Sequence, residues 1–144
     1  MPADTEALSA LAYRSKKSNG YDDAAMTRMR TALELTTARL SRHRFWVAEQ
    51  DSQIVGCVAL APIDNTTAAV RSFYIAPEHK GRGIGKMLWI ELLTIAQSQG
   101  VTCLTAEADP ASVTFYESLG FTTDELAPSR NLPGAIVPWM SRQI

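Results

Sequence analysis

Cysteine, histidine and long apolar runs are scarce in this sequence, and each scarcity excludes a class of protein. The chain has two cysteines and two histidines, and neither Cys57 nor Cys103 has another cysteine or a histidine nearby at metal-ligand spacing. Both cysteines lie in apolar surroundings, so we expect reduced, buried thiols in preference to a disulfide or a zinc site. No stretch approaches the roughly 20 apolar residues of a transmembrane helix, so we expect no membrane span.

An excess of charge of one sign is also lacking. The chain has 14 Lys and Arg residues against 15 Asp and Glu residues, a net charge of -1. This balance predicts no broad surface for nucleic acid or membrane, so any anion-binding site must be local. The N-terminus has neither the basic start nor the apolar run of a secretory signal, so we expect a cytoplasmic protein.

The rest of the composition is that of a globular protein. With 144 residues, 46% of them hydrophobic, the chain is long enough for one domain with a proper core, and we expect a single domain over residues 1–144.

The spacing of apolar residues predicts the secondary structure. Helical spacing covers 4–17, 22–40 and the segment from a glycine-rich turn to about Gln99, and a short helix follows Asp109 and Pro110. Extended segments are expected at 45–49, 54–61, 68–75, 101–106, 121–127 and 135–140, the last interrupted by Pro138. The order ααβββαβαββ indicates an α/β fold in which helices flank a mixed sheet.

The glycine-rich turn Lys80-Gly81-Arg82-Gly83-Ile84-Gly85-Lys86 lies between a strand and a helix. Amides at a helix N-terminus bind anions, and glycines let a phosphate approach the backbone closely, so the turn predicts a pyrophosphate site. A Walker A loop does not fit, because Lys80 takes its first glycine position and Met87 its hydroxyl position. A dinucleotide fingerprint fails at Lys86. The alternative is an ordinary turn with solvated basic residues.

Two segments together resemble the GNAT superfamily of acyl-CoA-dependent N-acyltransferases. Phe73–Lys86 matches the strand and Arg/Gln-x-x-Gly-x-Gly/Ala turn of that family, with Lys80 in place of the usual Arg or Gln. Asp109–Phe121 supplies the second motif, a helix with Ala-x-x-x-Phe-Tyr followed closely by Gly-Phe. The likeness covers roughly residues 44 to 121.

The resemblance implies a GNAT-like fold that binds acetyl-CoA as cosubstrate and needs no metal. The main chain of Phe73, Tyr74 and Ile75 is expected to hold the pantetheine arm like an added strand. The expected contacts of the phosphates are Lys80, Gly81, Arg82, Gly83, Ile84, Gly85 and Lys86.

Direct attack of an amine on the thioester, which the resemblance implies, requires an acid and a base. Tyr116 is the candidate acid, because its unperturbed pKa of about 10 keeps it protonated at neutral pH. Many relatives carry an acidic residue near the position of Arg71, so this position does not supply the usual base. Glu107, at the carboxyl end of a strand, is the candidate, with a surface role, a water chain or an already neutral amine as alternatives. We expect Asp109 to be a helix N-cap.

Two histidines and a tryptophan receive non-catalytic interpretations. His79 is expected to be a solvated member of the basic turn, and His43 a polar residue between helix and strand. Trp139 is expected to contribute to packing.

The predicted function is therefore transfer of an acetyl group from acetyl-CoA to a primary amine of a small molecule or peptide. The alternative is a non-catalytic acyl-CoA-binding sensor or regulatory module, and the presence of Tyr116 favours the enzyme. Specificity for the acceptor is expected in 17–23, which includes Tyr21, and in 128–134. Asp22 and Asp23 could attract a cationic amine or simply favour the start of a helix.

The family's usual first strand has no counterpart before the first predicted helix. We expect this strand to be absent, because the chain begins about where it would have ended. An incorrectly chosen start codon is the alternative explanation for its absence. The strand 45–49 is then expected at an exposed edge, where a homodimer could form.

Overall fold

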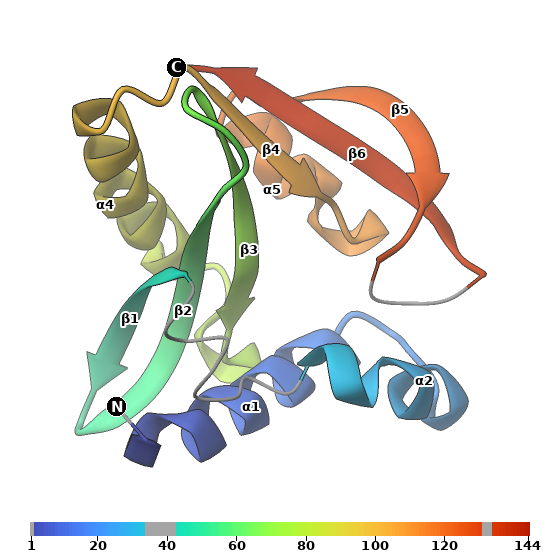
Figure 1. The fold of residues 1–144 in the computed structure, drawn as a ribbon. Coiled ribbons are helices and arrows are strands. Elements are labelled where there is room, and N and C mark those ends of the chain that lie inside the picture. Colours follow the sequence, from blue (N-terminus) through green and yellow to red (C-terminus); the bar gives the residue numbers. More distant parts are fainter. Residues whose placement is uncertain (1, 34–42, 131–133) are drawn as a thin grey trace.

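The computed structural model describes residues 2–33, 43–130 and 134–144. Its six strands form one sheet in the order β1-β2-β3-β4-β6-β5 (Figure 1). The strands are β1 (Arg44–Gln50), β2 (Gln53–Pro62), β3 (Thr67–Ile75), β4 (Cys103–Glu107), β5 (Thr122–Pro128) and β6 (Ile136–Gln143). The pairing of β3 with β4 is parallel and the other pairings are antiparallel, so the predicted mixed sheet is confirmed.

The helices follow the predicted order ααβββαβαββ. They are α1 (Pro2–Lys17), α2 (Asp23–Leu33), α4 (Ile84–Ser98) and α5 (Val113–Ser118). Single 3-10 turns at Pro77–His79 and Pro110–Ser112 precede α4 and α5. The predicted second helix extended to residue 40, and residues 34–40 lie outside the described residues.

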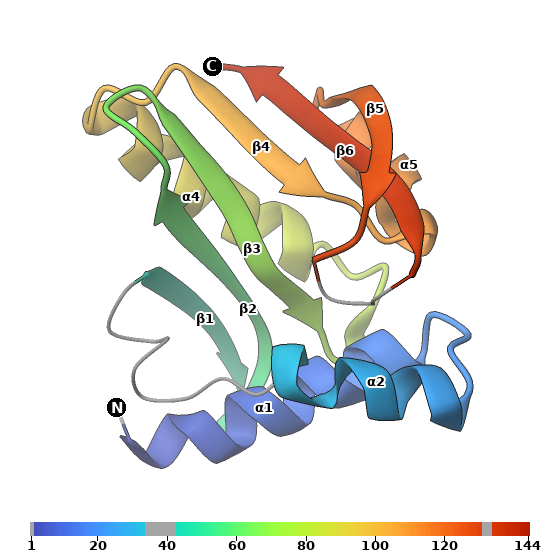
Figure 2. The same ribbon diagram turned by 45° about the vertical axis from the view of Figure 1, so that its right-hand side comes forward.

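The helices pack on opposite faces of the sheet and bury two separate clusters (Figure 2). The larger cluster joins α4 and α5 to one face through residues such as Leu88, Leu92 and Leu104. The smaller cluster joins α1 and α2 to the other face through Leu11, Met26 and other apolar residues. The sheet therefore separates two compartments that differ in their covering helices.

Local sequence explains the turns that set the strand register. Asp51 and Ser52 have φ of 52° and 66°, which makes the β1–β2 connection a two-residue turn whose twist suits a hairpin. β6 continues through Pro138, which lies just beyond the last β4–β6 pair, Glu107 and Trp139. At that position the missing N–H removes no hydrogen bond to β4, while the Pro138 carbonyl accepts the Ala108 N–H at 2.9 Å.

The edge position of β1 and the burial of Cys57 agree with the predictions, whereas Cys103 is less buried than predicted. In the part of the chain that the structure describes, β1 forms one edge of the sheet and β5 the other. Both cysteines are free thiols, and Cys57 is buried while Cys103 is only partly so. None of the helices in the described ranges combines the length and apolarity that crossing a membrane requires.

Candidate active site

A cleft of about 770 Å³ opens where β3 and β4 separate. The two strands pair only from Thr67 to Ala69 on β3 and from Cys103 to Thr105 on β4. Beyond this point the cleft is lined by both strands, the glycine turn, α5 and the C-terminal end of α1. A parallel pair that separates in this way leaves room for a ligand between its strands.

A bulge in β3 decides which side chains face each side of this cleft. Val70 points into the cluster shared with α4, so Arg71 points to the opposite face. Ser72 has φ of 51°, and the register with β2 shifts between Cys57 and Ala59. The extra residue returns Phe73 to the α4 face and leaves Arg71 on the face of α1 and α2.

The glycine turn presents main-chain amides to the cleft. Gly81 and Gly83 have φ of 78° and 83°, and Gly83 is the N-cap of α4. The Met87 N–H bonds to the Gly83 carbonyl at 3.1 Å, which leaves the earlier amides of α4 without helical acceptors. A Cβ on Gly85 would lie 3.0 Å from Cζ of Phe115, so the absence of a side chain lets α5 pack against the turn. The positive end of α4 therefore faces the cleft, which suits a phosphate.

Most of the predicted cofactor contacts line this cleft. They are Phe73, Tyr74, Ile75, Lys80, Gly81, Gly83, Ile84, Gly85 and Lys86. Arg82 is exposed on the turn and is not among the lining residues, so its contact with the cofactor stays a prediction.

Lys80 has a second role that the motif does not suggest. Its ammonium lies 2.5 Å from Ser18 Oγ, 3.0 Å from Asn19 Oδ1 and 3.3 Å from the Ser15 carbonyl. These bonds attach the glycine turn to the C-terminal end of α1, where cations are favoured.

Tyr116 lies on α5 inside an aromatic cluster. Its ring forms edge contacts with Phe73, Phe115 and Phe121, with centroid separations of 5.3 to 6.3 Å. The residue is only 6% exposed and lines the cleft. Among the described residues no group forms a hydrogen bond with its hydroxyl, and burial raises its pKa above the usual value. Tyr116 thus carries a proton at neutral pH at the wall of the cleft.

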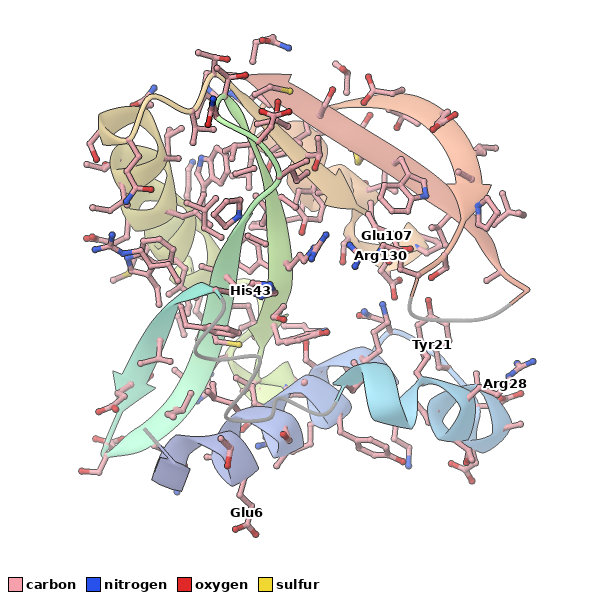
Figure 3. The ribbon with its side chains drawn as sticks, in the orientation of Figure 1. Glu6, Tyr21, Arg28, His43, Glu107 and Arg130 are labelled. Atoms are coloured by element: carbon pink, nitrogen blue, oxygen red, sulfur yellow. The ribbon has the colours of Figure 1, made fainter. Side chains whose placement is uncertain are left out.

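Glu107 lies at the end of β4, as predicted, and on the same face as Arg71. Leu104 and Ala106 point into the α4 cluster, so alternation along β4 directs Glu107 the other way. Its Oε1 accepts the main-chain N–H of Arg130 at 2.5 Å. Figure 3 shows Glu107 and Arg130 beside each other.

Asp109 joins the α1–α2 connection to the wall of the cleft. Its Oδ1 accepts the Ala111 N–H at 2.9 Å, which confirms the predicted N-cap. Its Oδ2 lies 2.7 Å from Lys16 Nζ and accepts the Tyr21 hydroxyl at 2.8 Å. Burial raises the pKa of Asp109, but Lys16 and these hydrogen bonds outweigh burial and lower it below the usual value. Burial and Asp109 also raise the pKa of Tyr21. At neutral pH Asp109 is therefore ionised and Tyr21 is protonated.

Several lining residues were given no individual functional role from the sequence, among them Arg71, His43 and Trp139, while Arg130 lies in the predicted specificity segment 128–134. His43 stacks on Phe45 with a centroid separation of 6.3 Å, and Trp139 Nε1 is buried without a hydrogen-bond partner among the described residues. Strand alternation about Val70 could have located Arg71. Arg130 could not be placed, because its position depends on how the β5–β6 connection folds back on β4.

Side chains and main-chain dipoles contribute charge to the site. Within the described ranges, no group of three or more His, Cys, Asp or Glu side chains is placed to hold a metal ion. The cleft offers amides for phosphates, a protonated phenol and a carboxylate. These are the groups that an acyl transfer to an amine uses.

Comparisons of sequence point to one family. The model of the acetyltransferase (GNAT) family matches residues 8–121. Human N-acetyltransferase 8B is 34% identical over 126 residues, which cover 79% of this chain and 54% of that protein. Rat N-acetyltransferase 8F1 is 31% identical over 111 residues, which cover 70% of this chain and 50% of that protein. The chain thus spans about half the length of these curated relatives.

Comparisons of structure give the same fold. The PaiA N-acetyltransferase of Thermoplasma acidophilum, solved in complex with coenzyme A, superposes with a TM-score of 0.80 and 20% identity, covering 99% of this chain and 94% of that one. A GCN5-related N-acetyltransferase of Rhodopseudomonas palustris gives a TM-score of 0.83 and 19% identity, covering 100% and 92%. At these identities the likeness is one of fold.

Proposed function

Because this chain belongs to the acetyltransferase (GNAT) family, we propose that it transfers an acetyl group from acetyl-CoA directly to the primary amine of an acceptor. One observation carries the proposal. The same cleft is lined by the glycine turn, by Tyr116 and by Glu107, although these lie on three separate segments of the chain. A phosphate site and a pair of proton-transfer groups therefore share one space.

The glycine turn holds the phosphates of the cosubstrate in this proposal. The first amides of α4 point away from the helix, and Gly81 and Gly83 place no Cβ near them. Acetyl-CoA supplies an activated acyl group as a thioester. The binding of its phosphates at the turn directs the thioester toward the gap between β3 and β4, where Tyr116 lies.

Tyr116 is the proposed general acid. It donates its hydroxyl proton to the leaving sulfur as the carbon–sulfur bond breaks. Because burial raises the pKa of Tyr116, the group arrives protonated and takes its proton back readily after each turnover. The aromatic contacts with Phe73 and Phe115 hold the ring in one orientation.

Glu107 is the proposed general base. It accepts a proton from the amine nitrogen as the carbon–nitrogen bond forms. The Arg130 N–H bonds to Oε1 of Glu107 and so helps to orient the carboxylate. The acid and the base thus come from two different elements that line the cleft, α5 and β4.

An acceptor screen tests this function. Acetyl-CoA is incubated with the protein and a panel of amines, and the released thiol and the mass of the acetylated product are both measured. Thermal shifts with acetyl-CoA, CoA, ATP and NAD run in parallel, because a ligand that binds the native state stabilises it in proportion to RT ln(1 + [L]/Kd). We expect CoA compounds to stabilise the protein more than ATP or NAD. Stabilisation without transfer to any amine would support the acyl-CoA sensor instead.

A further inference from the structure

The part of the cleft on the α1–α2 face is basic, and it is distinct from the glycine turn. Arg71 extends from β3 on the face opposite to α4, and Arg130 enters from the β5–β6 connection. Glu107 lies between these segments on β4 and contributes a carboxylate. The basic groups of the glycine turn lie at the start of α4 instead.

Arg71 is a cation that forms no ion pair in the described part of the chain. It is half-buried, and among the described residues its guanidinium forms no hydrogen bond and no ion pair. Burial and the charge of Arg130 lower the pKa of Arg71, and the charge of Glu107 raises it. Arg71 and Arg130 line the same cleft, and a partly desolvated guanidinium near a second one is stabilised by an additional anion.

The indole N–H of Trp139 also favours a ligand that accepts hydrogen bonds. Trp139 pairs with Glu107 in the register of β4 and β6, and its buried Nε1–H lacks a partner among the described residues. An indole N–H and a guanidinium are donors only, so a ligand in this compartment must supply acceptor atoms.

The carboxylates that could have attracted a cationic acceptor are already used. Asp22 Oδ1 accepts the Ala25 N–H at 2.8 Å and so caps α2. Asp23 lies 3.6 Å from Lys17 Nζ, and neither aspartate lines the cleft. Asp109 is neutralised by Lys16 at 2.7 Å. Among the described residues that line the acceptor side, the charges of Arg71 and Arg130 therefore exceed that of Glu107.

We infer that the acceptor carries a carboxylate close to its amine, as α-amino acids do, and that Arg71 and Arg130 bind that carboxylate while the amine is directed to Glu107. This inference rests on the proposed acetyl transfer. Guanidinium groups match carboxylates because their N–H donors form paired, charge-assisted hydrogen bonds. A zwitterionic acceptor leaves both Glu107 and the arginines with partners of opposite charge, whereas a polyamine would place cations against cations.

The test compares each common α-amino acid with its α-amide, which keeps the amine and side chain but loses the anion. We measure kcat and KM by thiol release for the native chain and for Arg71→Gln, Arg71→Lys and Arg28→Gln. Arg28 lies on α2 and points away from the cleft, so Arg28→Gln is the control for a lost positive charge (Figure 3). Circular dichroism and the thermal midpoint establish that each variant is folded.

The native chain and Arg28→Gln should prefer an amino acid over its amide by about 10- to 100-fold in kcat/KM, as expected for a charge-assisted contact. Arg71→Gln should abolish the preference by raising KM for the acid, with little effect on the amide. Arg71→Lys should restore part of it. Equal use of acids and amides by the native chain, or an equal loss for both in Arg71→Gln, would overturn the inference.

A binding measurement separates this inference from the proposed function. N-acetyl amino acids and their amides are titrated into the complex of the protein with CoA by calorimetry. Binding of the acids that is lost in Arg71→Gln supports the carboxylate site, even when no amine is acetylated and the proposed function is wrong. Transfer to amines without any contribution of a carboxylate to rate or binding would leave the function standing and refute the site.

Discussion

The two halves of the cleft are built in different ways. The proposed donor half uses mainly main-chain groups of one continuous segment, 73–86, with α5 packed against it. The proposed acceptor half uses side chains from β3, β4, the start of the β5–β6 connection and the end of α1. A site made of backbone leaves a mark in the sequence as glycines at fixed spacing. A site made of distant side chains leaves no contiguous mark.

The halves also differ in the interactions that hold them. Aromatic contacts among Phe73, Phe115 and Tyr116 stabilise the donor half. The acceptor half depends on a charged cluster in which Asp109 joins Lys16 and Tyr21. The donor half should therefore respond to changes of shape, and the acceptor half to changes of pH.

Tyr116→Phe should have the largest effect, and it probes the chemistry at the junction of the halves. The variant keeps the packed ring and deletes the hydroxyl, so kcat should fall by about 10² to 10⁴-fold while the Kd of CoA changes little. Tyr13→Phe, at a residue 38% exposed on α1, is the control. Near-full kcat under conditions where chemistry limits turnover would remove Tyr116 as the acid.

Glu107→Gln should lower kcat by about 10²-fold, because an amide cannot accept the proton of the amine. The Gln side-chain oxygen can still accept the Arg130 N–H, so the β5–β6 connection should keep its place. The exposed Glu125 on β5 provides the matched control, Glu125→Gln. An unchanged rate with a weakly basic amine, which arrives neutral, is compatible with this role; an unchanged rate with a strongly basic amine contradicts it.

Asp109→Asn should destabilise the acceptor half in a pH-dependent way. The Asp109 side chain is 7% exposed and the Lys16 side chain 14%, so loss of the charge should cost about 1–3 kcal/mol of unfolding free energy at pH 7. Because folding lowers the pKa of Asp109, its contribution is present above the unfolded value of about 3.9 and disappears as the pH falls through the folded value.

Denaturant titrations of both proteins from pH 7 to pH 3 check this. The difference between native chain and variant should shrink toward pH 3. The exposed Asp124 gives the control Asp124→Asn, which should show no such trend. A difference that is constant with pH would show that the cluster acts through shape and not through charge.

Gly83→Ala and Gly100→Ala form a matched pair with the smallest expected effect. Both glycines have left-handed φ, 83° and 81°, and an added Cβ would meet nothing within 4 Å at either. Each substitution should therefore cost about 1 kcal/mol of stability through backbone strain. Only Gly83 lines the cleft, so only Gly83→Ala should reduce the thermal shift given by CoA. Equal CoA shifts in both variants would exclude the turn from the cofactor site.

The sequence by itself determined the order of the elements and which elements carry the proposed donor half. Apolar periodicity and turn residues act over a few positions, so the glycine turn, the Asp109 cap and Tyr116 could be assigned to their elements before any tertiary contact was known. The predicted strand limits differ from the observed ones by at most three residues. The sequence predicted that Pro138 interrupts the last strand. In the structure β6 continues through Pro138, because β4 has already ended beside it.

Only the tertiary structure decided which side chains meet in the proposed acceptor half and that Lys80 also binds the end of α1. The bulge at Ser72 changes which face each later residue of β3 occupies, and such a register shift depends on pairing with β2. The approach of Arg130 to Glu107 joins positions 23 residues apart, and that of Lys80 to Asn19 joins positions 61 apart. Contacts over these separations depend on how the sheet and its helices pack, and local propensities carry no information about them.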